Sequence, residues 1–486
     1  MPTHIPKNSL SDLTFSREYA ADLGNPRRSQ RARKVGVALA LKPELSFPKV
    51  FPDEAGLEAA YRLLRNPEVD WRALAAPHAE RTLERAEAAG EVVVAHDTTA
   101  IALRMYWPDE RRRHMSSFSS RTQGFFAHVS LAMTADGRAL PLGVLGVQPF
   151  VHQSGLDAND SDSWAFWENE GGLYDNEHER WASAVAGTDD RLRERGVRAI
   201  HVMDGEADSY GLMSFFKEQD FRFVVRADSA RKLKCDGGLT DVGTVKVPLG
   251  ERFPLRDGKE SKRNPPRRAR EAELTIRAGV VTLARAQKKA DASWSPSGVE
   301  AQPKTLTLHL VEAVEKAPPA GQTGVRWLLL TTEPVKTQAE VLRVIDLYRR
   351  RWLIEEYFKS LKTGCRVEDR QMESMTTMLN VLALLIPAAW RLLVLRTLAH
   401  EAPATSWKNL LTPLEFKLLA GRVKRDKLGA PLGPNATVAQ CLAAIAKLGG
   451  HLKRNGPPGW QTLHAGWRSL QEMALGVRIF REASDQ

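Results

Sequence analysis

Cysteine is scarce in this sequence of 486 residues, and the three that occur lie far apart, at Cys235, Cys365 and Cys441. None forms a Cys-x-x-Cys pair or stands beside histidine at the spacing of zinc ligands. We therefore expect neither a disulfide framework nor a structural zinc site, and the predicted compartment is a reducing cytoplasm. The first residues carry no apolar run behind their charges, which predicts that no secretory signal is present.

Long apolar runs are also missing. The most apolar stretch, 381–390, contains Pro387 and is followed at once by Arg391. This stretch is too short to cross a bilayer, so we expect a buried helix there and a soluble protein that does not enter a membrane.

Acidic residues are outnumbered. The 59 Asp and Glu residues against 70 Lys and Arg leave a net charge of +11 and a pI near 9.5. Such an excess suits a polyanionic partner, with nucleic acid first and an anionic membrane surface second. A content of 43% hydrophobic and 27% charged residues is typical of a globular protein. The length predicts about three domains.

Helices are predicted up to about residue 70. Segment 16–23 has a helical pattern, and after it Asn25 can cap a second helix whose first position suits Pro26. This second helix is rich in arginine, and its basic face is either a solvated surface or a contact for nucleic acid. A further helix is expected at 54–65.

From residue 91 the pattern alternates between strands and helices, which is typical of an α/β fold. The expected strands are 92–96, 124–134, 139–151, 198–203 and 221–226, and the expected helices are 177–195 and 210–219. A β-rich insertion with a basic loop at 259–270 is predicted between residues 232 and 326, from strands at 273–283 and 305–312. The rest is a strand at 326–332, a long helix at 337–362 and a helical tail from about 402.

Two aspartates each follow a short apolar strand. Asp97 comes after strand 92–96, and Asp204 comes after strand 198–203. Functional groups of α/β folds often lie at strand ends. Carboxylates there suit chemistry on phosphodiesters, because hard divalent cations prefer oxygen ligands. The alternative is that each aspartate serves as a turn or cap residue.

The long helix predicted at 337–362 carries polar and charged residues on one face. At about 100° per residue, four of them share a stripe about 60° wide: Tyr348, Arg351, Glu355 and Lys362. Lys359 lies at the edge of this stripe. Arg351, Glu355 and Lys359 could form an i,i+4 ion-pair ladder. Alternatively, Glu355 completes a metal site while the cations hold a phosphate. Glu356 points about 100° away, which favours Glu355 as the ligand.

The four residues of this stripe resemble the Y-R-E-K signature of the IS4 family of DDE transposases. Further motifs resemble the family in the same order along nearly the whole chain: Gly24-Asn25-Pro26-Arg27-Arg28, Tyr61-Arg62, Asn66-Pro67, Asp97-Thr98-Thr99, Asp204-Gly205-Glu206-Ala207-Asp208, Phe223-Val224-Val225-Arg226, Trp327-Leu328-Leu329-Leu330-Thr331, Arg343-Val344-Ile345-Asp346, Ile445-Ala446-Lys447-Leu448-Gly449-Gly450 and Gly466-Trp467. His96 and the pair Phe125-Phe126 depart from the family pattern.

The resemblance implies an α/β fold with an RNase H-like catalytic core, a mixed sheet flanked by helices. It implies a helical DNA-end-binding domain at 1–70, a catalytic domain at 71–397 with a β-rich insertion at about 230–326, and a helical dimerisation domain at 398–486. It further implies roles for individual residues. The implied metal-binding catalytic triad is Asp97, Asp204 and Glu355. The implied DNA contacts are Tyr348, Arg351, Lys359, Lys362, Arg226, Trp327, Arg28 and Arg31.

The implied activity is cut-and-paste DNA transposition with two Mg²⁺ ions per site, for which Mn²⁺ can substitute. The partners would be double-stranded DNA, both transposon ends and target, and a second copy of the chain in a bacterial cytoplasm. Trp327 would accommodate a flipped base during hairpin formation. The alternative role of this side chain is packing in the core. Three other functions compete with transposition: a metal-dependent nuclease, a silenced transposase that only binds DNA, and a glycosidase with paired carboxylates. The last would leave the cationic stripe unexplained.

Overall fold

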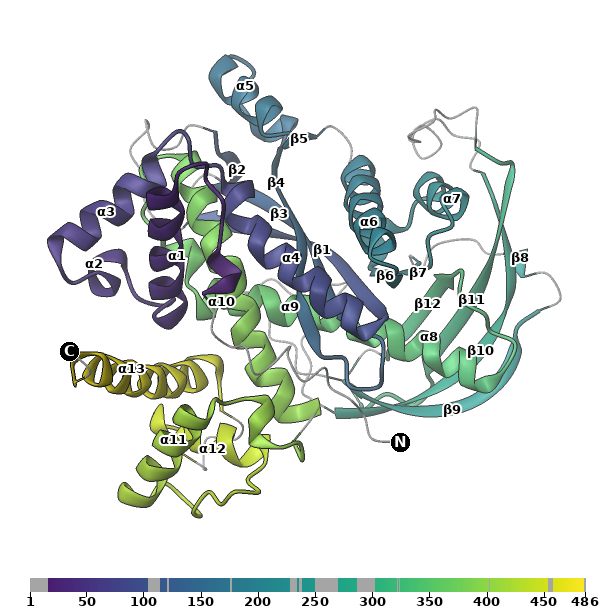
Figure 1. The fold of residues 1–486 in the computed structure, drawn as a ribbon. Helices are drawn as coiled ribbons and strands as arrows, with labels where there is room; N and C mark the ends of the chain where they lie inside the picture. The colour runs from purple at the N-terminus through teal and green to yellow at the C-terminus, as the bar shows by residue number, and fades with distance from the viewer. Residues whose placement is uncertain are drawn as a thin grey trace. The chain divides into compact units, whose positions relative to one another are not determined.

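The computed structural model describes residues 16–103, 114–119, 122–174, 177–227, 234–235, 238–249, 270–285, 302–320, 322, 324–401, 403–452 and 458–484. They group into two compact units (Figure 1). Unit 1 takes the described residues within 1–175, 187–198 and 352–486, and unit 2 takes those within 176–186 and 199–351. Helix α6 (Glu177–Glu194) contributes residues to both units.

Unit 1 contains most of the helices and one group of strands, which is antiparallel except for the parallel pair β4 and β5. Its helices are α1 (Pro26–Leu41), α2 (Phe47–Val50), α3 (Glu54–Arg65), α4 (Trp71–Ala89), α5 (Ser161–Asn169), α9 (Trp352–Lys359), α10 (Met375–Glu401), α11 (Pro413–Arg425), α12 (Val438–Leu448) and α13 (Trp460–Ser484). Its strands are β1 (Glu91–Leu103), β2 (Ser116–Ser119), β3 (Thr122–Thr134), β4 (Pro141–His152) and β5 (Leu173–Tyr174). They run in the order β5-β4-β3-β1, with β2 paired to β3.

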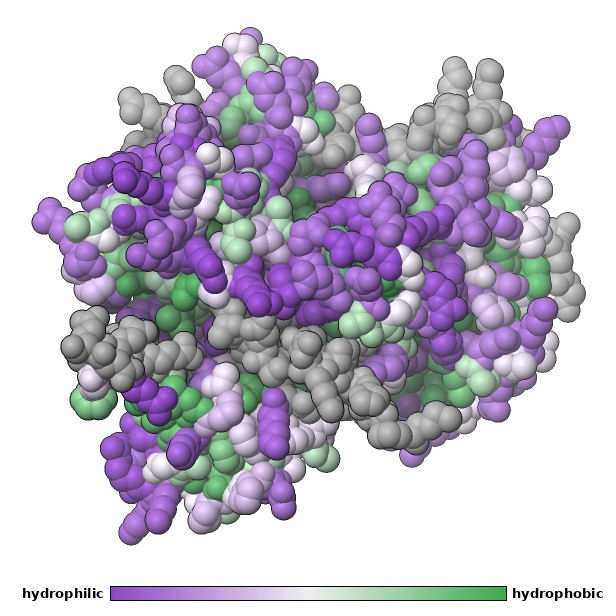
Figure 2. All heavy atoms as spheres, viewed as in Figure 1, coloured by the Kyte–Doolittle hydropathy of each residue, from purple (hydrophilic) through white to green (hydrophobic). Residues whose placement is uncertain are grey.

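Helix α10 forms the centre of unit 1. It contacts α1, α3, α4, α9, α12 and α13, and Figure 1 shows α1 and α4 beside it. Its segment Met375–Leu398 is long and apolar enough to cross a membrane by length and composition, but the whole apolar window is buried inside the structure. The helix expected around Pro387 is therefore confirmed as a core helix, and it is longer than the apolar run suggested. In the view of Figure 2, hydrophilic side chains cover α3 and α4. Their buried residues include Leu63 and Leu64 on α3 and Leu74 and Leu83 on α4.

Unit 2 consists of a larger group of strands with two helices of its own and the first part of α6. Its strands are β6 (Arg198–Met203), β7 (Phe223–Arg226), β8 (Lys234–Cys235), β9 (Thr240–Leu249), β10 (Arg270–Ala284), β11 (Thr305–Glu315) and β12 (Arg326–Thr331). Its helices are α7 (Tyr210–Glu218) and α8 (Gln338–Arg350). The strand order is β6-β7-β12-β11-β10-β8, with β9 also on β10. β6 and β7 are parallel, whereas the pairs from β7 to β10 are antiparallel.

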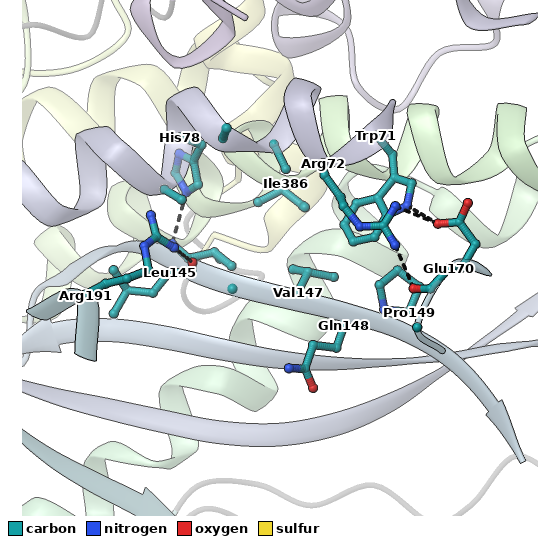
Figure 3. A pocket seen from close by; sticks show the side chains of 16 residues that line it. Trp71, Arg72, His78, Leu145, Val147, Gln148, Pro149, Glu170, Arg191 and Ile386 are labelled. Carbon is teal, nitrogen blue, oxygen red and sulfur yellow. Dashed lines mark hydrogen bonds and ion pairs between the residues drawn. The ribbon is translucent and has the colours of Figure 1, made fainter. Parts of the chain in front are cut away.

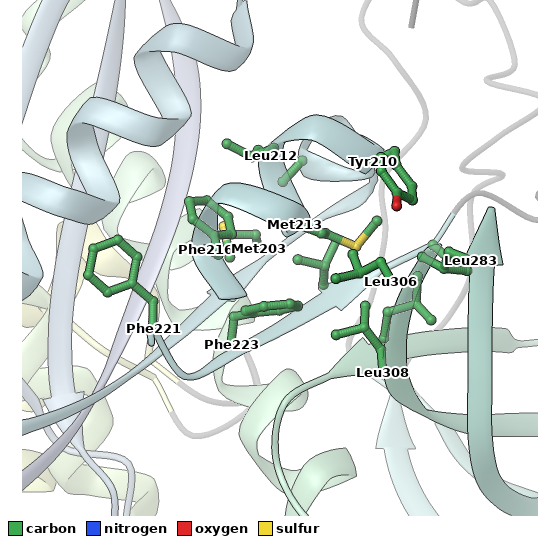
Figure 4. Close-up of a cluster of buried hydrophobic side chains, with 14 of the residues drawn as sticks. Met203, Tyr210, Leu212, Met213, Phe216, Phe221, Phe223, Leu283, Leu306 and Leu308 are labelled. Carbon is green, nitrogen blue, oxygen red and sulfur yellow. The ribbon is translucent and has the colours of Figure 1, made fainter. Parts of the chain in front are cut away.

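The core of unit 2 lies between α7 and the strands. It includes Met203, Met213, Phe216, Phe223 and Leu308, all fully or almost fully buried (Figure 4). Aromatic and branched side chains from the strands thus meet the apolar face of α7. Burial of each such side chain contributes about 1.5–3 kcal/mol to folding, and this packing supports the end of β6, where Asp204 follows.

The predicted mixed α/β class is confirmed, and the sheets flanked by helices are consistent with an RNase H-like DDE domain. The expected boundaries of α3 and β6 agree with the structure, and Asn25 caps α1 by accepting bonds from the backbone of Arg27 at 3.0 Å and Arg28 at 3.2 Å. The division into domains at 70 and 397 stays a prediction. The basic loop predicted at 259–270 lies outside the described residues except for Arg270.

Two expected helices are wrong in part. Within 16–23 the structure has only a 3₁₀ turn, Arg17–Tyr19. The helix expected at 337–362 is divided into α8, α9 and a π turn, Ser360–Gly364. Arg351 lies between α8 and α9, and its N–H bonds to the carbonyl of Tyr348 at 3.1 Å rather than to the carbonyl one residue earlier. The helical hydrogen-bond pattern therefore changes at Arg351.

Candidate active site and DNA-contact residues

Asp97 lies in the middle of β1. The strand pairs with β3 along its length, and Asp97 is opposite Val129. The Asp97 side chain is half-buried, and its Oδ1 accepts the N–H of Thr98 at 2.8 Å. On the other face of the strand, His96 Nδ1 lies 3.0 Å from Ser130 Oγ. These contacts hold the backbone on both sides of the carboxylate.

The expectation that Asp97 follows the end of a strand is wrong, because β1 continues to Leu103. Residues 98–103 are Thr-Thr-Ala-Ile-Ala-Leu, which include three β-branched side chains and favour a strand. They pair with residues 123–128 of β3. The acid and the two threonines suggested a turn, but the long partner strand determines the local structure.

Glu355 lies on α9, which packs against β1. Its side chain is half-buried. The neighbouring Glu356 forms ion pairs with Lys359 Nζ at 2.7 Å and with Arg396 Nη1 at 3.2 Å. Unit 1 thus brings two members of the predicted triad, Asp97 and Glu355, onto elements that are in contact.

Asp204 follows β6 directly, as the sequence predicts. Its Oδ1 accepts the N–H of Glu206 at 2.9 Å, so it also serves as the cap of the 3₁₀ turn Gly205–Ala207. β6 and β7 are parallel with Met203 opposite Val225, which places Asp204 and Arg226 at the same edge of the sheet. A Cβ built on Gly205 would lie 3.9 Å from Nη2 of Arg226.

Tyr348 interacts with the other residues of unit 2 that were predicted to contact DNA. Its side chain is only 5% exposed, and its ring meets Trp327 edge-on with the ring centres 5.6 Å apart. Burial raises the pKa of the Tyr348 phenol; the charges of Arg351 and Arg226 oppose this rise, and the charge of Asp204 adds to it. The structure therefore brings together five predicted site residues in unit 2. Trp327 itself is half-buried.

The two lysines after Glu355 have partners within unit 1. Lys359 is exposed and bonds to Glu356, so the step from Glu355 to Lys359 in the alternative ion-pair ladder is not formed. Lys362 lies in the π turn, and its Nζ donates to the carbonyl oxygen of Ala100 at 2.6 Å. It also lies 3.5 Å from Glu368, a residue that the sequence did not single out. Glu368 stands in a short polar segment without periodicity, which offers no signal of its position.

The two N-terminal arginines differ. Arg28 forms an ion pair with Glu68, and its Nη1 donates to the carbonyl of Leu23 at 3.1 Å. Arg31 is exposed on α1. Arg28 therefore stabilises the connection between α1 and the end of α3, whereas Arg31 presents its charge to solvent.

A cavity of about 440 Å³ lies in unit 1 between α4 and β4 (Figure 3). Trp71, Arg72, Val147 and Arg191 are among its lining residues. Its arginines are already paired: Arg72 with Glu170 at 2.8 Å, and Arg191 with the carbonyl of Leu145 at 2.9 Å. None of the predicted site residues lines this cavity, so we assign it no part in the site.

Carboxylate oxygens alone make up the predicted metal ligands, and this hard donor set fits Mg²⁺ or Mn²⁺. Within the described ranges, no three His, Cys, Asp or Glu side chains form a ready-made metal-binding group.

Two family models match the chain. A transposase DNA-binding model matches residues 16–69, which include α1 to α3. A transposase DDE domain model matches residues 177–388, which include Asp204 and Glu355 but begin after Asp97. A DDE domain of this class is a divalent-metal-dependent phosphoryl-transfer domain. The match to a DNA-binding domain and the match to a DDE domain together support the function of a DNA transposase.

Proposed function

We propose that this chain is a cut-and-paste transposase of the IS4 family, similar to the Tn5 transposase. It would bind the end repeats of a transposon, cleave them and join the ends to target DNA. The observation that carries the proposal is the arrangement in unit 2, where the charges of Arg351, Arg226 and Asp204 act on the buried phenol of Tyr348, and where Gly205, next to Asp204, lies close to Arg226. A carboxylate surrounded by cations and a phenol suits a phosphodiester, because the cations neutralise phosphate while the carboxylate serves the reacting centre.

The ligands of two Mg²⁺ ions would be Asp97, Asp204 and Glu355. Such ions, when bound, stabilise the charge on the attacking and leaving oxygens of a phosphoryl transfer. Asp97 and Glu355 are presented by β1 and by the helix that packs on it. Arg226, Arg351, Lys359 and Lys362 would neutralise phosphates near the transposon end. Arg31 would help the N-terminal domain bind the end, and Arg28 would support this binding by holding α1 through its ion pair with Glu68.

The reaction would proceed in four displacements at phosphorus. Water first cuts one strand and frees a 3′-OH at the transposon end. This hydroxyl attacks the opposite strand, displacing its flanking DNA and closing a hairpin, which water then opens. The restored 3′-OH finally attacks target DNA. During hairpin closure Trp327 would stack on a flipped base, which offsets the few kcal/mol that unstacking costs.

Two copies of the chain would act on two DNA ends, joined through the helices of 398–486, in a bacterial cytoplasm close to the nucleoid. This assembly is part of the proposal and follows from the family resemblance.

The test is cleavage of DNA that carries the flanks of this gene, in Mg²⁺, with the wild type and Asp97→Asn. We expect metal-dependent cuts at defined ends that are absent in the variant, followed by strand-transfer products when target DNA is added. Cutting without joining would identify a nuclease instead. Specific binding without cutting by the wild type would identify a silenced transposase.

A further inference from the structure

The edge of β1 beyond Asp97 is held by side chains. Three backbone groups of alternate residues point to the same side of the strand, away from β3. The N–H of Thr98 bonds to Asp97 itself, the carbonyl of Ala100 accepts from Lys362 at 2.6 Å, and the N–H of Ala102 donates to Glu368 Oε1 at 3.3 Å. Side chains thus supply the hydrogen-bond partners for the backbone groups along this edge, which a neighbouring strand would supply in a longer ladder.

The last two of these partners come from the segment that follows Glu355. Lys362 lies in the π turn directly after α9, and Glu368 lies in the 3₁₀ turn Val367–Asp369. Glu368 is only 6% exposed, and its Oε1 is 3.5 Å from Lys362 Nζ. The ion pair therefore fixes two consecutive turns to one strand. We name Lys362, Glu368 and the two β1 groups that they hold, at Ala100 and Ala102, the strand clamp.

We propose that Glu368 is a positioning residue for phosphoryl transfer: through the strand clamp it holds α9, and with it Glu355, in register with the strand that carries Asp97. The inference rests on the proposed function, since it assumes that both carboxylates take part in the reaction. Ala100 and Ala102 lie three and five residues beyond Asp97, and Lys362 lies seven residues beyond Glu355. A slip between helix and strand would therefore move one carboxylate relative to the other.

The clamp also changes the interpretation of Lys362. Its ammonium group already has a carbonyl and a buried carboxylate as partners in the protein without DNA. A lysine whose only role is to bind a phosphate would not need these two partners. Lys362 thus orients α9 before any DNA is bound. A catalytic group must be held within about 0.5 Å of its productive position, and a misplacement of about 1 Å can reduce the rate about a hundredfold.

The test compares Glu368→Ala and Glu368→Gln with a matched control, Glu373→Gln. Glu373 lies five residues further along the chain and forms an exposed ion pair with Arg65. For each variant we would measure the single-turnover nicking rate, the affinity for end DNA, the melting temperature, and hydrogen exchange of the peptide containing Ala102.

We expect Glu368→Ala to nick at least tenfold more slowly, with end affinity within about twofold of the wild type. Amide exchange at Ala102 should accelerate in this variant. Glu368→Gln keeps an acceptor for that N–H and should recover part of both losses, and Glu373→Gln should behave as the wild type. Lys362→Met should reproduce the exchange change without any DNA present.

A Glu368→Ala enzyme that nicks at the wild-type rate would overturn the positioning role. Unchanged exchange at Ala102 in this variant would show that the clamp does not hold β1. A slower variant whose end affinity falls in proportion would assign Glu368 to DNA binding or folding instead. If the wild type fails to nick end DNA, the proposed function is refuted and the positioning role with it, while the exchange data still decide whether the clamp exists.

Discussion

A buried charge cluster joins the N-terminal turn to α4, and it predicts a marked effect of one substitution, Glu18→Gln. The carboxylate of Glu18 lies 2.5 Å from Nδ1 of His78 and 2.7 Å from Nη1 of Arg85. Arg85 also lies over the ring of Trp390, 4.2 Å from its centre. His78 Nε2 accepts the N–H of Val144 at 3.0 Å, so the ring is neutral and donates to Glu18 from Nδ1.

The magnitude follows from the pKa of Glu18. Burial would raise it, but the charge of Arg85 and the hydrogen bonds from His78 and Arg85 lower the pKa from 4.5 to about 2. A depression of this size corresponds to about 3 kcal/mol of stability. Because the folded-state pKa lies below the unfolded value, this stability is present above about pH 4.5 and is lost as the pH falls toward 2. Burial also lowers the pKa of His78, which adds to the loss of stability in acid below about pH 6.5.

Glu18→Gln removes the carboxylate and leaves the charge of Arg85 buried without its partner, at a cost of about 3–5 kcal/mol. We expect the melting temperature at pH 7 to fall by on the order of 5 °C. The matched control is Glu68→Gln, which removes a carboxylate that is 66% exposed in its ion pair with Arg28. The difference between Glu18→Gln and the wild type should shrink as the pH falls, because by about pH 3 the wild type has lost more than half of the same contribution.

Thermal unfolding of the three proteins between pH 3 and 7 checks this reasoning. The calculation is refuted if Glu18→Gln melts within about 1 °C of the wild type at pH 7. It is equally refuted if the difference in melting temperature does not change with pH, because the loss would then come from packing and not from charge.

Three further predictions concern the proposed site and the N-terminal domain. Glu355→Gln should abolish single-turnover cleavage with end affinity within a few-fold, whereas Glu356→Gln should keep cleaving; a fully active Glu355→Gln enzyme would reject the triad. End binding should weaken steeply with salt, and Arg31→Ala should lower the slope of log K against log salt by about 0.9, the amount of one phosphate contact. Arg28→Ala should instead act mainly through stability and leave this slope unchanged. Equal slopes for the two variants would contradict the different roles assigned to Arg28 and Arg31. Asn25→Ala should destabilise α1 by about 1 kcal/mol, seen as faster amide exchange in its first turn; unchanged exchange there would show that the cap is dispensable.

The sequence predicts those parts of the fold that local interactions decide. Asn25 caps α1 through its own side chain, and β6 is a short apolar run followed by a cap residue, Asp204. In both cases the residues that determine the structure are neighbours in the chain, so the pattern contains the information. The three expected bounds that agree with the structure, at α3, β6 and the start of α1, are of this kind.

Long-range contacts decide the rest. The pairing with β3 extends β1 past Asp97 in spite of a polar Asp-Thr-Thr sequence. Glu18 is buried because Arg85 and His78, more than fifty residues away in sequence, supply its partners. Glu368 gives no periodic signal, since one of its partners is a backbone N–H of a strand about 266 residues earlier. A single sequence does not reveal such pairs.

The stripe from Tyr348 to Lys362 shows where the two kinds of information meet. Its geometry assumes one straight α-helix, but the hydrogen-bond pattern changes at Arg351 and again in the π turn at Ser360–Gly364. A π turn holds more residues per turn than an α-helix, so the 100° rule no longer gives the direction of Lys362. The deviation directs Lys362 toward the carbonyl of Ala100. The residue types of the stripe thus point to phosphoryl transfer, while the break in periodicity, which only the structure reveals, couples the helix of Glu355 to the strand of Asp97.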